Sequence, residues 1–338
     1  MQRLSRCVAC ASQNWSVTEV RNGYELAVCS DCGLLFTVNP DYKAERYLAS
    51  YEGKEAEGVL PEAYSYVYAG PQLRLEQEGR AFLCPPPRLT PAERLALRWV
   101  KAHIPNRAAV VECGCGTGRF LRALKNARLS GVGVELSAVT VQLLNRAGLK
   151  AVQGAAPGFP WESSEPFAIA FFEVLEHLPE PREIIEPLKR RFPRAVILGS
   201  VPSPTGQSAR NKSPTDSPPH HYLLWTPTAL ERFFSQLGYS KVTVHVPKPA
   251  GYEQMASCGM LLSRFKRFRP RPSSGTAPAA SPKDSPIQTP SGRTLAATFK
   301  VWLLYAYHGW INVFGTLKAR RAGREGFSAS SMLFIAEP

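Results

Sequence analysis

The chain has 338 residues, 44% of them hydrophobic, which suffices for one large domain with a small one, or for two domains. Its formal net charge is +14, and residues 260–338 hold 12 Lys and Arg against 3 acids, a local excess of 12 − 3 = +9. Such a basic tail suits nucleic acid, an anionic membrane surface or an acidic substrate, or it is an ordinary solvated surface. The first residues lack the apolar core of a signal peptide, and no apolar run reaches the roughly 18 residues of a membrane span. We therefore expect a cytoplasmic protein.

Four N-terminal cysteines form two Cys-x-x-Cys pairs, Cys7 with Cys10 and Cys29 with Cys32. The alternating segments between the pairs predict a hairpin that turns at residues 22–23, an Asn-Gly dipeptide. Each pair can bring two thiolates to one ion, and a closed four-sulfur shell is typical of a structural rather than a catalytic metal. Residues 1–40 are therefore predicted to be a zinc ribbon that holds a structural Zn2+.

The next segment, residues 41–89, is rich in Tyr and Glu and has no clear period. We expect either a connector or short helices that cover an active site. Its tyrosines could line a substrate cleft or could be ordinary packing aromatics: Tyr47, Tyr51, Tyr64, Tyr66 and Tyr68.

A helix is predicted to start at Pro91, because Thr90 can cap it and Glu93 stands at its third position. It should end before Pro105. The apolar residues Leu95, Trp99 and Val100 are expected to form its buried stripe.

The centre of the chain is a strand that passes through three glycines into a helix. Residues 108–111 predict a buried strand, Glu112 follows, and a helix is predicted over residues 119–127. The glycines between them stand at alternate positions: Gly114, Gly116 and Gly118. Such a turn lets a ligand lie against bare backbone at the start of a helix.

A second predicted strand, residues 130–135, ends in another acid, Glu135. Ser137 is expected to cap a helix over residues 138–147. A short strand at residues 150–153 then leads to Gly154.

Together these residues resemble known motifs. Glu112 to Gly118 read as acidic-x-Gly-x-Gly-x-Gly, which resembles motif I of the class I S-adenosylmethionine-dependent methyltransferases. The run Phe-Glu-Val-Leu-Glu-His-Leu-Pro at residues 172–179 resembles motif IV of methyltransferases close to ubiquinone-pathway and sugar-modifying enzymes. The segment at residues 33–40 resembles the one that follows the ribbon in many bacterial methyltransferases. The resemblance covers about residues 90–246, the final strand and the ribbon.

The resemblance implies a bound S-adenosylmethionine. Glu135 would accept hydrogen bonds from the ribose hydroxyls, and Glu173 would face the methionine end or the methyl acceptor. The full set of implied cofactor contacts is Glu112, Gly114, Cys115, Gly116, Gly118, Glu135, Leu136, Gly154 and Glu173. The chain departs from the family twice: Ala155 stands where many relatives carry an Asp that reaches the adenine, and Ala168 replaces the Asp of the usual Phe-Asp pair.

The remaining segments complete an α/β pattern. Strands are predicted at residues 167–172, 195–201, 239–246 and 331–336, and helices at residues 180–191 and 226–238, with Pro187 expected to kink or shorten the first helix. The fold class is therefore α/β: a doubly wound, Rossmann-like sheet of seven strands with an antiparallel last strand, plus the ribbon. The methyltransferase domain would span residues 90–250 and 330–338.

A Pro/Ser/Thr-rich loop, residues 202–221, ends in His220 and His221. Relatives show a similar Pro-His-His segment at the rim of the active site. One of these histidines could take a proton from an acceptor, or the pair could simply order the loop. Glu173 is the third catalytic candidate, whereas His177 could as well be a capping or packing residue.

Residues 251–329 read as an insertion, with a Pro/Ser/Thr-rich stretch at 269–293 predicted to be disordered. Residues 295–314 are aromatic and apolar, and a basic cluster follows at 318–321. This part, residues 295–321, could contact a membrane surface peripherally, or it could be a helix packed on the domain or at a dimer seam.

The predicted function is methyl transfer from S-adenosylmethionine to an O, N or C centre of a small molecule: a sugar, a lipid-linked compound or a secondary metabolite. No catalytic metal is needed for that reaction. Two alternatives stay open: an RNA methyltransferase that grips phosphate with its basic residues, and a non-catalytic binding protein with a degenerate cofactor site. The acceptor and the oligomeric state do not follow from the sequence.

Overall fold

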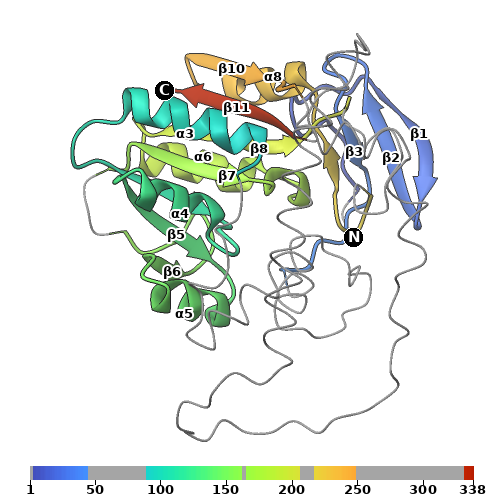
Figure 1. Ribbon diagram of the computed structural model, residues 1–338. Helices are drawn as coiled ribbons and strands as arrows, with labels where there is room; N and C mark the ends of the chain where they lie inside the picture. Colours follow the sequence, from blue (N-terminus) through green and yellow to red (C-terminus); the bar gives the residue numbers. More distant parts are fainter. Residues whose placement is uncertain (1–2, 45–88, 162–164, 206–216, 249–330) are drawn as a thin grey trace, which may run out of the picture. The chain divides into compact units, whose positions relative to one another are not determined.

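Figure 1 shows the computed structural model, which describes residues 3–44, 89–161, 165–205, 217–248 and 331–338. The interpretations of the tyrosine-rich segment from residue 45 to 88 and of the insertion at 249–330 lie outside these described residues. Within them, no helix is both long and apolar enough to cross a membrane.

The described chain forms two sheets with helices. Its strands are β1 (Trp15–Arg21), β2 (Tyr24–Cys29), β3 (Leu35–Thr37), β4 (Ala109–Cys113), β5 (Ser130–Glu135), β6 (Ala151–Gln153), β7 (Ala168–Phe172), β8 (Val196–Pro202), β9 (Leu223–Leu224), β10 (Lys241–His245) and β11 (Ser331–Glu337). Its helices are α3 (Pro91–His103), α4 (Arg119–Asn126), α5 (Ala138–Arg146), the 3-10 turn η2 (Leu175–His177), α6 (Arg182–Arg191) and α8 (Pro227–Gln236).

The large sheet has seven strands in the order β10-β11-β8-β7-β4-β5-β6. The pairs β4–β5, β5–β6, β4–β7 and β7–β8 are parallel, and β11 is antiparallel to both of its neighbours. The predicted doubly wound α/β sheet with an antiparallel last strand is confirmed. The chain runs outward from β4 through β5 to β6 and then returns to β7 on the other side of β4. In such sheets ligands bind at the carboxyl ends of the strands, where the winding direction reverses.

Both faces of this sheet are covered, which explains why β7 is apolar throughout. Ile169 and Phe171 point into one core with α6 and α8, whereas Ala170 and Phe172 point into a second core with α3, α4 and α5. The alternation follows the two-residue period of a strand.

The helix ends follow the predicted capping chemistry. Thr90 and Glu93 form a reciprocal capping box at the start of α3, and the Thr226 hydroxyl accepts a hydrogen bond from the Ala229 amide at the start of α8. The predicted stripe on α3 is partly wrong: Val100 is buried, but Leu95 and Trp99 are only half-buried. Helix α6 does not end early at Pro187 and continues to Arg191.

The small N-terminal sheet has the order β1-β2-β3-β9. Strands β1 and β2 form the predicted hairpin. The fourth strand comes from far along the chain, since β3 pairs with β9 through Leu35 with Leu224 and Phe36 with Leu223. This pairing, which does not follow from the sequence, joins the ribbon to the segment just after His220 and His221.

Candidate active site and metal centres

The glycine turn after β4 is tied to the end of the neighbouring strand β5. The Gly114 amide donates to the Val134 carbonyl at 2.8 Å, and the Gly116 amide donates to Glu135 Oε2 at 2.9 Å. All three motif glycines have positive φ, 69°, 50° and 71° in chain order. At Gly118 a side chain is doubly excluded, since a Cβ there would also come within 2.6 Å of a Leu144 methyl group.

Glu135 lies at the carboxyl end of β5 and is almost fully buried, at 4% exposure. Its Oε1 accepts from the amides of Leu136 at 2.8 Å and Ser137 at 3.2 Å, while Oε2 accepts from Gly116. The Gly154 amide donates to the Glu135 main-chain carbonyl at 3.0 Å. The structure therefore brings together the predicted cofactor residues of the glycine turn, of β5 and of the β6 end at one edge of the sheet.

Glu112, at the fourth position of β4, is buried and belongs to a group of charges around Arg119. Arg119 Nε donates to Glu93 Oε1 at 2.8 Å, and Glu93 is only 2% exposed. Burial raises the pKa of Glu112 well above its ordinary value, and the nearby Glu93 carboxylate adds to the rise. Glu112 Oε2 has no hydrogen-bond partner among the described residues. Arg119, which directly follows the glycine turn, is therefore a cation that interacts with both Glu93 and Glu112.

Glu173 follows β7 and has a left-handed backbone, with φ at 55°. The Ser200 hydroxyl donates to its Oε1 at 2.6 Å, and its amide donates to the Ser200 carbonyl at 2.9 Å. Burial raises the pKa of Glu173. A non-glycine residue held at positive φ is strained, and such residues are concentrated at functional sites.

Three histidines of the described chain come together: His177, His220 and His221. His177 ends η2, and its ring lies close to the rings of His220 and His221: the possible ligand nitrogens of the three lie within 4.8 Å of one another. His177 Nδ1 lies 2.8 Å from the His220 carbonyl oxygen and therefore donates to it. Burial lowers the pKa of His177 to about 3 and lowers the pKa of His220 and of His221 as well. All three rings are therefore neutral at pH 7.

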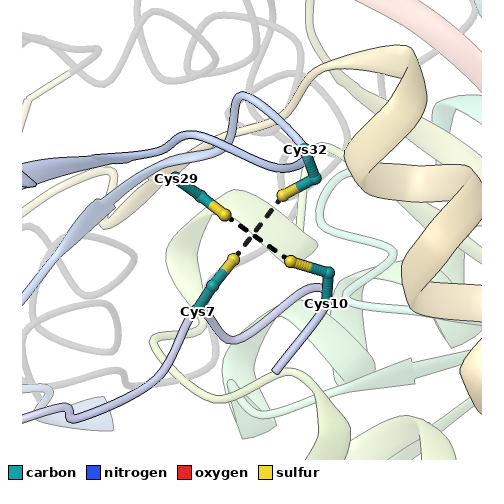
Figure 2. A group of neighbouring side chains, drawn as sticks. All are labelled: Cys7, Cys10, Cys29 and Cys32. Carbon is teal, nitrogen blue, oxygen red and sulfur yellow. Dashed lines mark hydrogen bonds between the residues drawn. The ribbon is translucent and has the colours of Figure 1, made fainter. Parts of the chain in front are cut away.

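The four ribbon cysteines converge on one point, as Figure 2 shows. Their sulfur atoms lie 3.6 Å apart for Cys7 with Cys32 and 3.5 Å apart for Cys10 with Cys29. A tetrahedral ion with sulfur ligands at ~2.3 Å would separate the sulfurs by about 3.8 Å, so the cysteines fit a four-thiolate site closely. The chain around them is held by α8, since Thr226 donates to the Cys32 carbonyl and Gln236 to the Cys10 carbonyl.

Residues 88–244 match the methyltransferase domain family Methyltransf_23. This part of the chain is a class I methyltransferase domain.

Known proteins resemble the chain in part. An uncharacterized protein of Methanocaldococcus jannaschii is 29% identical over 104 residues, which cover 30% of this chain and 48% of that protein. The chain thus spans about half the length of the curated relative that it matches. A methyltransferase of Archaeoglobus fulgidus has a TM-score of 0.40 at 15% identity, covering 73% of this chain and 94% of the other. An N-methyltransferase 2 of Haemonchus contortus, in complex with phosphomonomethylethanolamine and S-adenosylhomocysteine, has a TM-score of 0.47 at 14% identity, covering 90% and 62%.

The two departures from the family lie in different places in the methyltransferase domain. Ala168 is fully buried and pairs with Val110, level with the start of β4 and β7. It is therefore remote from the carboxyl edge, and its side chain lies in the core that the sheet forms with α3 and α4. Ala155 is exposed and follows Gly154 directly, so it does lie at the edge where the glycine turn and Glu135 meet.

Two features of this domain did not follow from the sequence. The sequence pattern indicates only a helix start at Arg119 and only a capping residue at Glu93. A cation at the first position of a helix opposes the helix dipole, and this local mismatch was the available signal. The approach of His177 to His220 and His221 had no local signal, because 43 residues separate the segments.

Proposed function

We propose that the protein transfers a methyl group from S-adenosylmethionine to an O, N or C centre of a small-molecule acceptor, such as a sugar, a lipid-linked compound or a secondary metabolite. The acceptor atom attacks the sulfonium methyl in line. The new bond to the methyl carbon forms as the sulfur–methyl bond breaks, which leaves neutral S-adenosylhomocysteine and releases a proton where the acceptor carried one. The methyl group is already activated by the positive sulfur, so the protein mainly has to align the two reactants.

The observation that carries this proposal is the contact between Glu135 and the glycine turn. The carboxylate is fixed by three backbone amides at the end of β5, beside main chain that bears no side chains at Gly114, Gly116 and Gly118. A carboxylate in this place suits the two ribose hydroxyls, because it can accept a hydrogen bond from each. The bare turn at the start of α4 suits the rest of the cofactor.

The charges behind the turn suit the methionine end of the cofactor, which carries an ammonium and a carboxylate. The acids Glu112 and Glu173 would hold the ammonium, and Arg119 would hold the carboxylate. On the acceptor side, His220 and His221 remain the candidate proton acceptors. Their lowered pKa values keep them unprotonated at neutral pH but weaken them as bases.

We also propose that the ion of the four-cysteine site is a structural Zn2+. The short sulfur–sulfur distances support it, and a closed shell of four thiolates leaves no position for a substrate. Its contribution would be to hold the ribbon together beside α8.

Titration calorimetry with S-adenosylmethionine tests the cofactor proposal. Wild-type protein should bind it, and Glu135→Ala should weaken binding about 10- to 100-fold, since hydrogen bonds to a charged group contribute about 1.5–3 kcal/mol. Glu231→Ala, at an exposed position on α8, is the control and should bind normally. A wild-type protein that does not bind the cofactor would support the alternative of a non-catalytic protein.

The acceptor class is tested by label transfer from S-adenosylmethionine into metabolite extracts and, in parallel, into RNA. Label in small molecules supports the proposal. Label in RNA, together with RNA binding that falls steeply as salt rises, would favour the nucleic-acid alternative.

A further inference from the structure

The histidine cluster contains more convergent nitrogen ligands than the proposed methyl transfer requires. The rings of His177 and His220 have centroids 4.8 Å apart, those of His177 and His221 are 4.6 Å apart, and those of His220 and His221 are 4.7 Å apart. A general base needs one imidazole that a neighbouring group orients. It does not need three whose nitrogens meet.

We propose that His177, His220 and His221 form a second metal site, which binds a divalent transition-metal ion such as Zn2+ or Co2+. Neutral imidazole is a preferred ligand of these ions. Three protein ligands leave a coordination position open, unlike the closed shell of the four cysteines.

The distances permit such a site with small movements. Nitrogens bound at about 2.1 Å around a tetrahedral ion lie roughly 3.4 Å apart. The ligand atoms of the three rings already lie within 4.8 Å of one another. Ring rotations that move each nitrogen by about an ångström would close the site.

The surroundings resemble those that orient metal-binding histidines. Donation from His177 Nδ1 to the His220 carbonyl fixes the tautomer, so that the lone pair of this neutral ring lies on Nε2. The fully buried carboxylate of Glu176 lies 4.0 Å from that Nε2 and would offset part of the charge of an ion. A backbone hydrogen bond also joins the two segments that carry the histidines, because the Tyr222 amide donates to the Glu176 carbonyl at 2.9 Å.

The site also bears on the methyl acceptor, and this step depends on the function proposed above. A hydroxyl oxygen of the acceptor, bound at the open position, would have a lowered pKa. It would lose its proton to solvent before it attacks the methyl group. The histidines would then act as ligands, and no imidazole would have to serve as a base.

Cobalt uptake by the full-length protein tests the metal site. Protein with its ribbon zinc retained is treated with a mild chelator and titrated with Co2+, and both metals are counted by elemental analysis. We expect one Co2+ per chain with visible d–d absorption. Strong near-ultraviolet thiolate-to-cobalt absorption, which would mark entry into the ribbon, should be absent.

His177→Gln and the double variant His220→Gln/His221→Gln should lose this Co2+. His245→Gln, an exposed histidine on β10, is the control and should keep it. No Co2+ uptake by wild-type protein beyond the ribbon, or equal uptake by the cluster variants, would overturn the proposal.

Calorimetry with S-adenosylmethionine on the same samples separates the two proposals. Variants that bind the cofactor normally are folded, so their loss of Co2+ reports on the site itself. Wild-type protein that takes up Co2+ but does not bind S-adenosylmethionine would contradict the proposed function and leave the metal site standing.

Discussion

Arg21, the last residue of β1, donates a hydrogen bond of 2.7 Å to the hydroxyl of Ser217, 196 residues further along the chain. Asn22, beside it in the hairpin turn, donates to the Pro218 carbonyl at 2.9 Å. The amides of His220 and His221 both donate to the Ser217 carbonyl, at 3.0 and 3.1 Å. The tip of the ribbon hairpin therefore holds the segment that carries two of the three clustered histidines.

The first prediction concerns this link. Arg21→Ala/Asn22→Gly removes both side-chain donors and keeps a residue that tolerates the positive φ of position 22. We expect faster hydrogen exchange at the amides of residues 220 and 221, because their anchor loosens, with unchanged affinity for S-adenosylmethionine. The control is Arg3→Ala, which removes an exposed ion pair with Glu25 in the same ribbon. Unchanged exchange in the double variant would contradict the link.

The second prediction concerns the ribbon metal. Cys10→Ser/Cys29→Ser should lose one equivalent of zinc by elemental analysis, because two sulfurs cannot complete the four-thiolate shell. The variant should also melt at a lower temperature, since metal binding contributes to folding. Cys258→Ser, outside the ribbon, should keep the zinc. A wild-type protein without zinc would refute the four-thiolate site.

The third prediction separates a steric clash from backbone strain at Gly118. Gly118→Ala combines positive φ with a Cβ 2.6 Å from Leu144, whereas Gly238→Ala, at φ 80°, meets nothing within 4 Å. We expect Gly238→Ala to cost about 1–2 kcal/mol of unfolding free energy. Gly118→Ala should cost about 1–3 kcal/mol more, because neighbouring side chains must move. Denaturant unfolding measures both, and equal losses would mean that the turn relaxes freely.

The fourth prediction concerns pH and Glu112. Burial raises the pKa of this carboxyl well above 4.5, its ordinary value, so the folded state holds the proton more tightly than the unfolded state. Its contribution to stability is therefore complete below about pH 4.5 and is lost as pH rises through the raised pKa. Glu112→Gln stays neutral, so its stability relative to wild type should increase as pH rises above 4.5. Thermal unfolding from pH 4 to 9 measures the difference, and a constant difference would contradict the raised pKa.

Some features of the site followed from the sequence because their causes are local. The capping box of Thr90 and Glu93 lies within four residues, and strand β5 was predicted with its observed bounds, Ser130 to Glu135. The three glycines and the acid at each strand end also stand within short stretches. Their chemistry depends on residue type and spacing alone, and it predicted the edge of the sheet where the cofactor residues gather.

The local sequence pattern gave a wrong interpretation of Ala168, because the role of this residue depends on its position along strand β7. Ala168 looked like a damaged cofactor residue because it follows Phe167, but its register with Val110 places it at the opposite end of the strand. Only the pairing of strands decides which end of a buried segment faces the ligand.

The class I sheet, the glycine turn with Glu135 and the four cysteines with ribbon spacing could all be predicted from local sequence patterns. The tertiary structure alone decided that β9 joins the ribbon sheet, that Arg119 faces Glu93 and Glu112, and that His177 meets His220 and His221. The reason is physical: caps, turns and periodicity act over a few residues, whereas these contacts form only when packing closes long stretches of chain.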